Sequence, residues 1–75
     1  MGVTVRRYLV TLETHAEGPC DVVYVDARAV APLRAIANAV RDCAGMGPWA
    51  VMRAVPWPRG VSSAEDAAAR AAGVR

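Results

Sequence analysis

The side chains best suited to chemistry lie close together in the first third of the chain. His15, Glu17 and Cys20 bring an imidazole, a carboxylate and a thiol into one short segment, and such groups bind zinc or form nucleophile–base pairs. Either kind of site needs further partners, and the chain contains no other histidine. The same segment contains Gly18-Pro19, a pair typical of turns. We therefore expect a solvent-exposed polar turn here rather than a metal site or a catalytic centre.

Two aspartates and a second cysteine complete the candidates for chemistry. Asp26 and Asp42 could act as an acid–base pair, but neither a glycine-rich loop nor a neighbouring histidine accompanies them. Cys20 and Cys43 are expected to be small buried apolar residues rather than nucleophiles. The sequence thus predicts no enzymatic activity, no cofactor and no metal.

The composition bounds the class of protein. A chain of 75 residues has room for one small domain, which we expect to extend over residues 1–75. The apolar content of 55% favours a folded chain over a disordered one. No apolar run is long enough to cross a bilayer, so we expect a cytoplasmic protein with no membrane partner and no disulfide. Lysine is absent, a bias typical of GC-rich genomes such as those of actinobacteria and their phages.

The basic residues are dispersed along the chain. The formal net charge is only +2, whereas nucleic-acid-binding domains usually carry a concentrated positive face. A phosphate-contacting surface could still form from Arg6, Arg7, Arg28, Arg34 and Arg41. A small nucleic-acid-binding protein that uses these dispersed arginines is therefore the alternative function.

The N-terminal part of the chain has the pattern of a β-hairpin. Residues 3–13 form an alternating run in which Tyr8, Val10 and Leu12 are predicted to face the core. Residues 20–26 contain a continuous apolar run, which is typical of a central strand. The two segments are close enough in sequence to pair antiparallel.

A helix is predicted to begin at Pro32, because proline is favoured at the first helical position. Its polar stripe comprises Arg34, Asn38 and Arg41. Its apolar face is predicted from residues at helical spacing, namely Leu33, Ile36, Ala37, Val40, Cys43 and Ala44.

The segment that follows allows two interpretations. Val51 and Val55 fit strand alternation, yet Gly47 followed by Pro48 is also typical of a helix start, and the local pattern alone favours neither. Residues 55–60 contain two prolines and fit only an edge strand or an extended connector. Trp57, which lies between these prolines, is expected to cover part of the core.

A last helix is predicted from a capping box with Ser62 at the N-cap and Glu65 at the third helical position. Its buried face contains only alanine, so it can pack closely but buries little area. The residues of this face are Ala64, Ala67, Ala68 and Ala71.

The order of these features resembles the C-terminal domain of the bacterial ribosomal stalk protein. That family has a strand close to Phe-Asp-Val-Val-Leu, a helix ending in Ala-Val-Arg and a Gly-Leu-Gly-Leu break. A second helix, a proline-containing connector, Gly-Val-Ser and an acidic Ala-rich helix ending in Ala-Gly follow. The counterparts here are residues 20–24, 39–41, 45–48, 60–62 and 63–73. The resemblance implies that residues 48–55 form a helix, and hence a helical hairpin.

The chain departs from the stalk pattern at both ends. It has an additional strand before the family's first one, and it lacks most of the family's last strand after Gly73. The Clp-protease adaptor family has a related fold and is a weaker match. It would require an acidic pocket, for which Asp21, Asp26 and Asp42 are the candidates.

The resemblance also implies a partner and a docking surface. Stalk domains meet translational GTPases through lysines on the helical hairpin; here Asn38 and Trp49 occupy two such places, and Arg41 keeps its charge. Tryptophan and arginine are frequent in binding hot spots, although Trp49 could instead cover a small edge of the core. We therefore expect Trp49→Ala or Arg41→Ala to abolish partner capture and to leave the fold intact. The predicted partner-binding residues are Arg34, Asn38, Arg41, Met46, Trp49 and Met52.

Together these observations predict an α+β fold. A small antiparallel sheet, made of the N-terminal hairpin and a short edge strand, would be covered by the helical hairpin and the C-terminal Ala-rich helix. The predicted function is a non-enzymatic protein-interaction module that docks a translational GTPase or another ribosome-associated factor. Exposed sheet edges and a small core also favour a homodimer.

Overall fold

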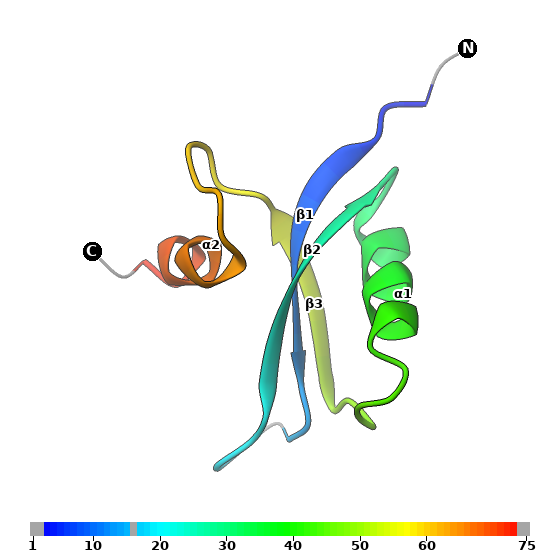
Figure 1. The fold of residues 1–75 in the computed structure, drawn as a ribbon, viewed down its shortest axis with the longest axis vertical. Helices are drawn as coiled ribbons and strands as arrows, with labels where there is room; N and C mark the ends of the chain where they lie inside the picture. The colour runs from blue at the N-terminus through cyan, green and yellow to red at the C-terminus, as the bar shows by residue number, and fades with distance from the viewer. Residues whose placement is uncertain (1–2, 16, 74–75) are drawn as a thin grey trace.

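The computed structural model describes residues 3–15 and 17–73, which form a three-stranded sheet with a helix on each face (Figure 1). Residues 1–2, 16 and 74–75 of the expected domain lie outside the described ranges. The predicted α+β class and antiparallel sheet are confirmed, and β1 occupies the centre of the sheet in the order β2-β1-β3. The elements are β1 (Arg6–Glu13), β2 (Val22–Ala29), α1 (Pro32–Asp42), β3 (Val51–Pro56) and α2 (Ala64–Ala71).

The main core lies between the sheet and α1. Tyr8, Val10 and Leu12 point from β1 to this side and are almost completely buried, so their predicted orientation is confirmed. Ala27 and Ala29 of β2 are buried beside them. Because side chains alternate along a strand, the neighbouring residues of β1 point to the opposite face, toward α2.

Helix α1 begins at Pro32 as predicted, but its buried face differs from the prediction. Ala35 and Ala39 are fully buried against the sheet, whereas Leu33 is 80% exposed. Ile36, Val40 and Cys43 pack beside these alanines. The small alanine side chains allow the helix backbone to approach the sheet closely. The helix is therefore rotated relative to the face inferred from its larger apolar residues.

The predicted helix over residues 48–55 is wrong, and with it the helical hairpin. Val51–Pro56 is strand β3, which pairs antiparallel with β1. Val51 and Val55 are β-branched and therefore suit a strand, and their alternation was the other interpretation of the sequence. Gly47 has a φ of 98°, which is a turn conformation rather than a helix start. The short edge strand predicted within residues 55–60 is thus found a few residues earlier.

Helix α2 covers the second face of the sheet and begins one residue later than predicted. The N-cap is Ser63, not Ser62, and its Oγ accepts a hydrogen bond from the Asp66 backbone N–H at 3.2 Å. Ala67 is fully buried, while Ala71 is exposed. Among the described residues, neither helix has the length and apolar character needed to cross a bilayer.

Candidate interaction surface

The second strand carries the most distinctive exposed feature of the fold. Its apolar run predicted a central strand, and this prediction is wrong, because β2 lies at the edge of the sheet and pairs only with β1. Val23 and Val25 face the side of α1, whereas Val22 and Tyr24 face the side of α2 and are 39% and 40% exposed. Apolar residues on both sides are typical of a strand whose two faces are covered, yet Val22 and Tyr24 are only partly covered here.

The pairing register shows which backbone groups of β2 point outward. One pair beyond the ends of the two strands, the Thr14 backbone N–H donates to the Asp21 carbonyl at 3.1 Å. Hydrogen-bonded and non-hydrogen-bonded pairs alternate along an antiparallel ladder, so the odd-numbered residues of β2 bond to β1. The groups at the outer edge are therefore the N–H and C=O of Val22, Tyr24, Asp26 and Arg28.

One end of this outer edge is already contacted by α1. The Asn38 side-chain amide donates to the Arg28 carbonyl at 3.5 Å, at the limit of a hydrogen bond. Asn38 in turn accepts a hydrogen bond from Arg41 at 3.0 Å. Within the described residues, no hydrogen bond is found for the outward groups of Val22, Tyr24 and Asp26.

The outer edge of β3 differs from that of β2. The Trp57 backbone N–H donates to the Arg7 carbonyl at 3.1 Å, so the same alternation places Met52, Ala54 and Pro56 at the outer edge. Proline has no N–H to offer to a further strand, and proline at an edge is a common protection against unwanted pairing. β3 is also shorter, with 6 residues against 8 in β2. β2 therefore offers the longer and less protected edge.

A shallow groove of about 270 Å³ runs beside the outer edge of β2, on the face of the sheet that α2 covers only in part. Its floor is formed by all three strands, and the last turn of α2 forms one wall. The side chains that line it are Leu9, Thr11, Glu13, Val22, Tyr24, Arg53, Val55, Ala68, Ala71 and Ala72. The groove thus continues from Val22 and Tyr24 across the sheet, and Thr11, Glu13 and Arg53 are its polar side chains.

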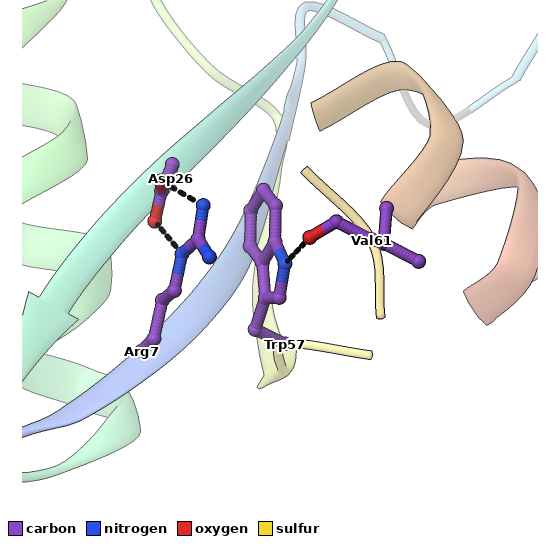
Figure 2. Close-up of polar contacts among 4 residues, drawn as sticks. All are labelled: Arg7, Asp26, Trp57 and Val61. Carbon is purple, nitrogen blue, oxygen red and sulfur yellow. Dashed lines mark hydrogen bonds and ion pairs between the residues drawn. The ribbon is translucent and has the colours of Figure 1, made fainter. Parts of the chain in front are cut away.

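A chain of polar contacts links β2, β1 and the connector to α2 on this face of the sheet. The Arg7 guanidinium binds the Asp26 carboxylate through two hydrogen bonds, of 2.9 and 2.6 Å, and lies 3.8 Å from the centre of the Trp57 ring (Figure 2). The Trp57 indole N–H donates to the Val61 carbonyl at 2.7 Å. Trp57, which was expected to cover part of the core, is half-buried on the α2 face of the sheet and is not among the residues packed against the main core.

The ion pair shifts the pKa values of both partners. The hydrogen bonds from Arg7 hold the pKa of Asp26 below its ordinary value, and the hydrogen bond with Asp26 raises the pKa of Arg7. Asp26 is therefore an anion with a fixed partner under neutral conditions. This arrangement is typical of a structural contact rather than of a group that transfers protons.

The residues of the polar turn considered above for metal binding or catalysis lie between β1 and β2, in the described ranges 3–15 and 17–73. No group of three potential metal ligands occurs there. His15 is exposed, and the nearest polar contact of Cys20 is the Glu13 carboxylate, 4.0 Å from its sulfur. Glu13 itself is bound by Arg53 at 2.9 Å. No hydrogen bond joins His15 and Cys20 within these ranges.

The structure separates the residues predicted to bind a partner. Arg34, Asn38 and Arg41 lie on α1, and Asn38 reaches the β2 edge. Met52 lies on β3, at the opposite edge of the sheet. Trp49 is half-buried and packs against the main core rather than projecting outward. Met46 is exposed in the loop after α1. These six residues therefore do not form the face of a helical hairpin.

The arginines considered for nucleic-acid binding also fall on different surfaces. Arg7 lies on the α2 side of the sheet and is paired with Asp26, whereas Arg34 and Arg41 lie on α1 at the other face. They are not gathered into the single basic face that phosphate binding usually requires.

The backbone edge of β2 is the feature that the interpretation of the sequence missed. The continuous apolar run of residues 20–26 marked a strand, but it could not show that this strand lies at the edge of the sheet, because strand order depends on contacts between residues far apart in the sequence. Comparison with known proteins adds no family to these observations, because no family model, curated protein or solved structure matches the chain.

Proposed function

We propose that this chain is a non-enzymatic protein-interaction module that takes an extended segment of a partner onto the outer edge of β2. The observation that carries this proposal is an apolar strand with an unpaired, exposed edge. Addition of a strand to a sheet edge is a common mode of peptide recognition, in which main-chain hydrogen bonds give affinity and alternate side chains give specificity.

The contacts around the edge support this mode of binding. An added strand would bond to the outward groups of Val22, Tyr24 and Asp26. Its side chains on the α2 side would lie next to exposed Val22 and Tyr24, at the border of the groove. Apolar residues at alternate positions of the partner would therefore be selected, and charged ones there disfavoured.

The partner predicted from the stalk-domain resemblance is a translational GTPase or another ribosome-associated factor in the cytoplasm, and we retain it as a proposal. If such a factor is the partner, the contact surface would be the polar face of α1, with Arg34, Asn38 and Arg41. The two surfaces can be tested separately, because Arg41 is exposed and lies outside the β2 edge.

The experiment is a selection of random peptides displayed on phage against the immobilised chain, followed by binding of the selected peptides to variants. Tyr24→Pro removes an outward N–H without removing a hydrogen bond to β1, so the fold should be retained and peptide binding lost. Tyr24→Ala keeps the N–H and should bind more weakly than the parent, but measurably. Arg41→Ala should bind like the parent.

Two results would overturn the proposal. The first is selection of peptides that bind Tyr24→Pro as well as the parent. The second is loss of binding in Arg41→Ala with full binding in Tyr24→Pro, which would place the contact surface on α1.

A further inference from the structure

The exposed side chains of β2 include two of opposite charge, Asp26 and Arg28. We propose that the occupant of the outer edge is β2 of a second copy of this chain, paired antiparallel about a two-fold axis so that the two sheets become one. This inference rests on the proposed function, because it names the partner of the same edge.

Charge complementarity favours one register, in which the Asp26 carboxylate would meet Arg28 of the second copy in addition to Arg7 of its own chain. Asp26 and Arg28 are exposed, point to the same side of β2 and are separated by one residue. If the two-fold axis passes beside Ala27, Asp26 of each copy lies opposite Arg28 of the other. The dimer then contains the same oppositely charged pair twice. Opposite charges at facing positions stabilise a strand pair, and like charges destabilise it.

The backbone is compatible with this register. The N–H and C=O groups of Asp26 and Arg28 are among those that point outward, so each facing pair can exchange main-chain hydrogen bonds. The Asn38 contact to the Arg28 carbonyl is long, at 3.5 Å. A carbonyl oxygen has two lone pairs and can also accept from a second strand.

The same register covers exposed apolar side chains. Tyr24 of one copy would lie opposite position 30 of the second copy, one residue beyond the end of β2. Tyr24 and Val30 are 40% and 45% exposed in the single chain. Aromatic and β-branched residues form favourable pairs across strands. Each copy therefore provides both members of the apolar pair as well as both members of the charged pair.

The difference between the two edges favours a closed dimer. Pro56 protects the outer edge of β3, so β2 is the edge available for pairing. A two-fold contact uses the same patch on both copies and leaves no open β2 edge for further growth. A small domain also gains buried surface by sharing it with a second copy.

The test is the molar mass of the whole chain, measured by size-exclusion chromatography with light scattering over a series of concentrations. The parent should approach twice the mass of one chain as its concentration rises. Tyr24→Pro should remain at the mass of one chain. Arg28→Asp places like charges opposite each other twice and should weaken association roughly tenfold or more. Arg34→Asp makes the same charge change on α1 and should associate like the parent.

The outcomes separate this inference from the proposed function. A parent that stays monomeric at every concentration but binds selected peptides at the β2 edge overturns the inference and leaves the proposed function standing. A dimer that persists in both Tyr24→Pro and Arg28→Asp, at the concentrations where the parent is dimeric, overturns the inference by placing the contact elsewhere. Dimer loss in Arg34→Asp but not in Arg28→Asp would overturn it in favour of an α1 contact.

Discussion

Replacement of Trp57 tests how the connector to α2 is held against the sheet. In Trp57→Phe the ring that stacks on Arg7 is kept, but the 2.7 Å hydrogen bond to the Val61 carbonyl is lost. A hydrogen bond of this kind contributes about 1 kcal/mol to stability. For a domain of this size, such a loss lowers the unfolding temperature by roughly 4–8 °C. The measurement is thermal unfolding followed by circular dichroism.

Trp49→Phe is the matched control for this experiment. Trp49 is also half-buried, and no side-chain hydrogen bond from it is found within the described residues. Both substitutions reduce ring size, so the difference between their unfolding temperatures reports the hydrogen bond. Trp57→Ala also removes the stacked ring and should be the least stable Trp57 variant. If Trp57→Phe and Trp49→Phe unfold at the same temperature, the proposed role of the Val61 contact is refuted.

Three further predictions follow from the core and the ion pair. Leu12 is fully buried, so Leu12→Ala should lower the free energy of unfolding in urea by about 3 kcal/mol. Leu33 is 80% exposed, so Leu33→Ser should leave the urea midpoint nearly unchanged. A loss of stability in Leu33→Ser as large as that in Leu12→Ala would contradict the orientation of α1. Asp26→Asn should lower the urea midpoint at neutral pH. Because the folded-state pKa of Asp26 is lowered, its contribution is present above its ordinary pKa and is lost as the pH falls through the lowered value, so the difference from the parent should close in strong acid. A difference that is independent of pH would contradict the Arg7–Asp26 contact as its cause.

The sequence predicted the elements with local signals more successfully than those that depend on distant contacts. The alternation around Val10 and the proline at position 32 identified β1 and the start of α1. The segment around Val51 was equally compatible with a helix by its own pattern, and only its pairing with β1 makes it a strand. The stalk-domain resemblance favoured the wrong alternative at this point.

The candidate surface was harder to predict for the same reason. The apolar run at Val22 and Tyr24 was recognised, but its place at the edge of the sheet depends on β3 taking the other side of β1. The sequence left two positions open for Trp49, projection from a helix or cover of a core edge, and the structure shows that it packs against the core. Trp49→Ala should therefore destabilise the fold itself, contrary to the expectation from the sequence.

The central claim is that the outer edge of β2 binds a strand, and residue-resolved amide exchange measured by nuclear magnetic resonance tests it most directly. In the dilute, unbound chain the N–H groups of Tyr24 and Asp26 should exchange rapidly, while those of Val23 and Val25, which bond to β1, are protected. Addition of a selected peptide, or a rise in protein concentration, should slow exchange at Tyr24 and Asp26. Binding that leaves these two amides in rapid exchange would contradict the account.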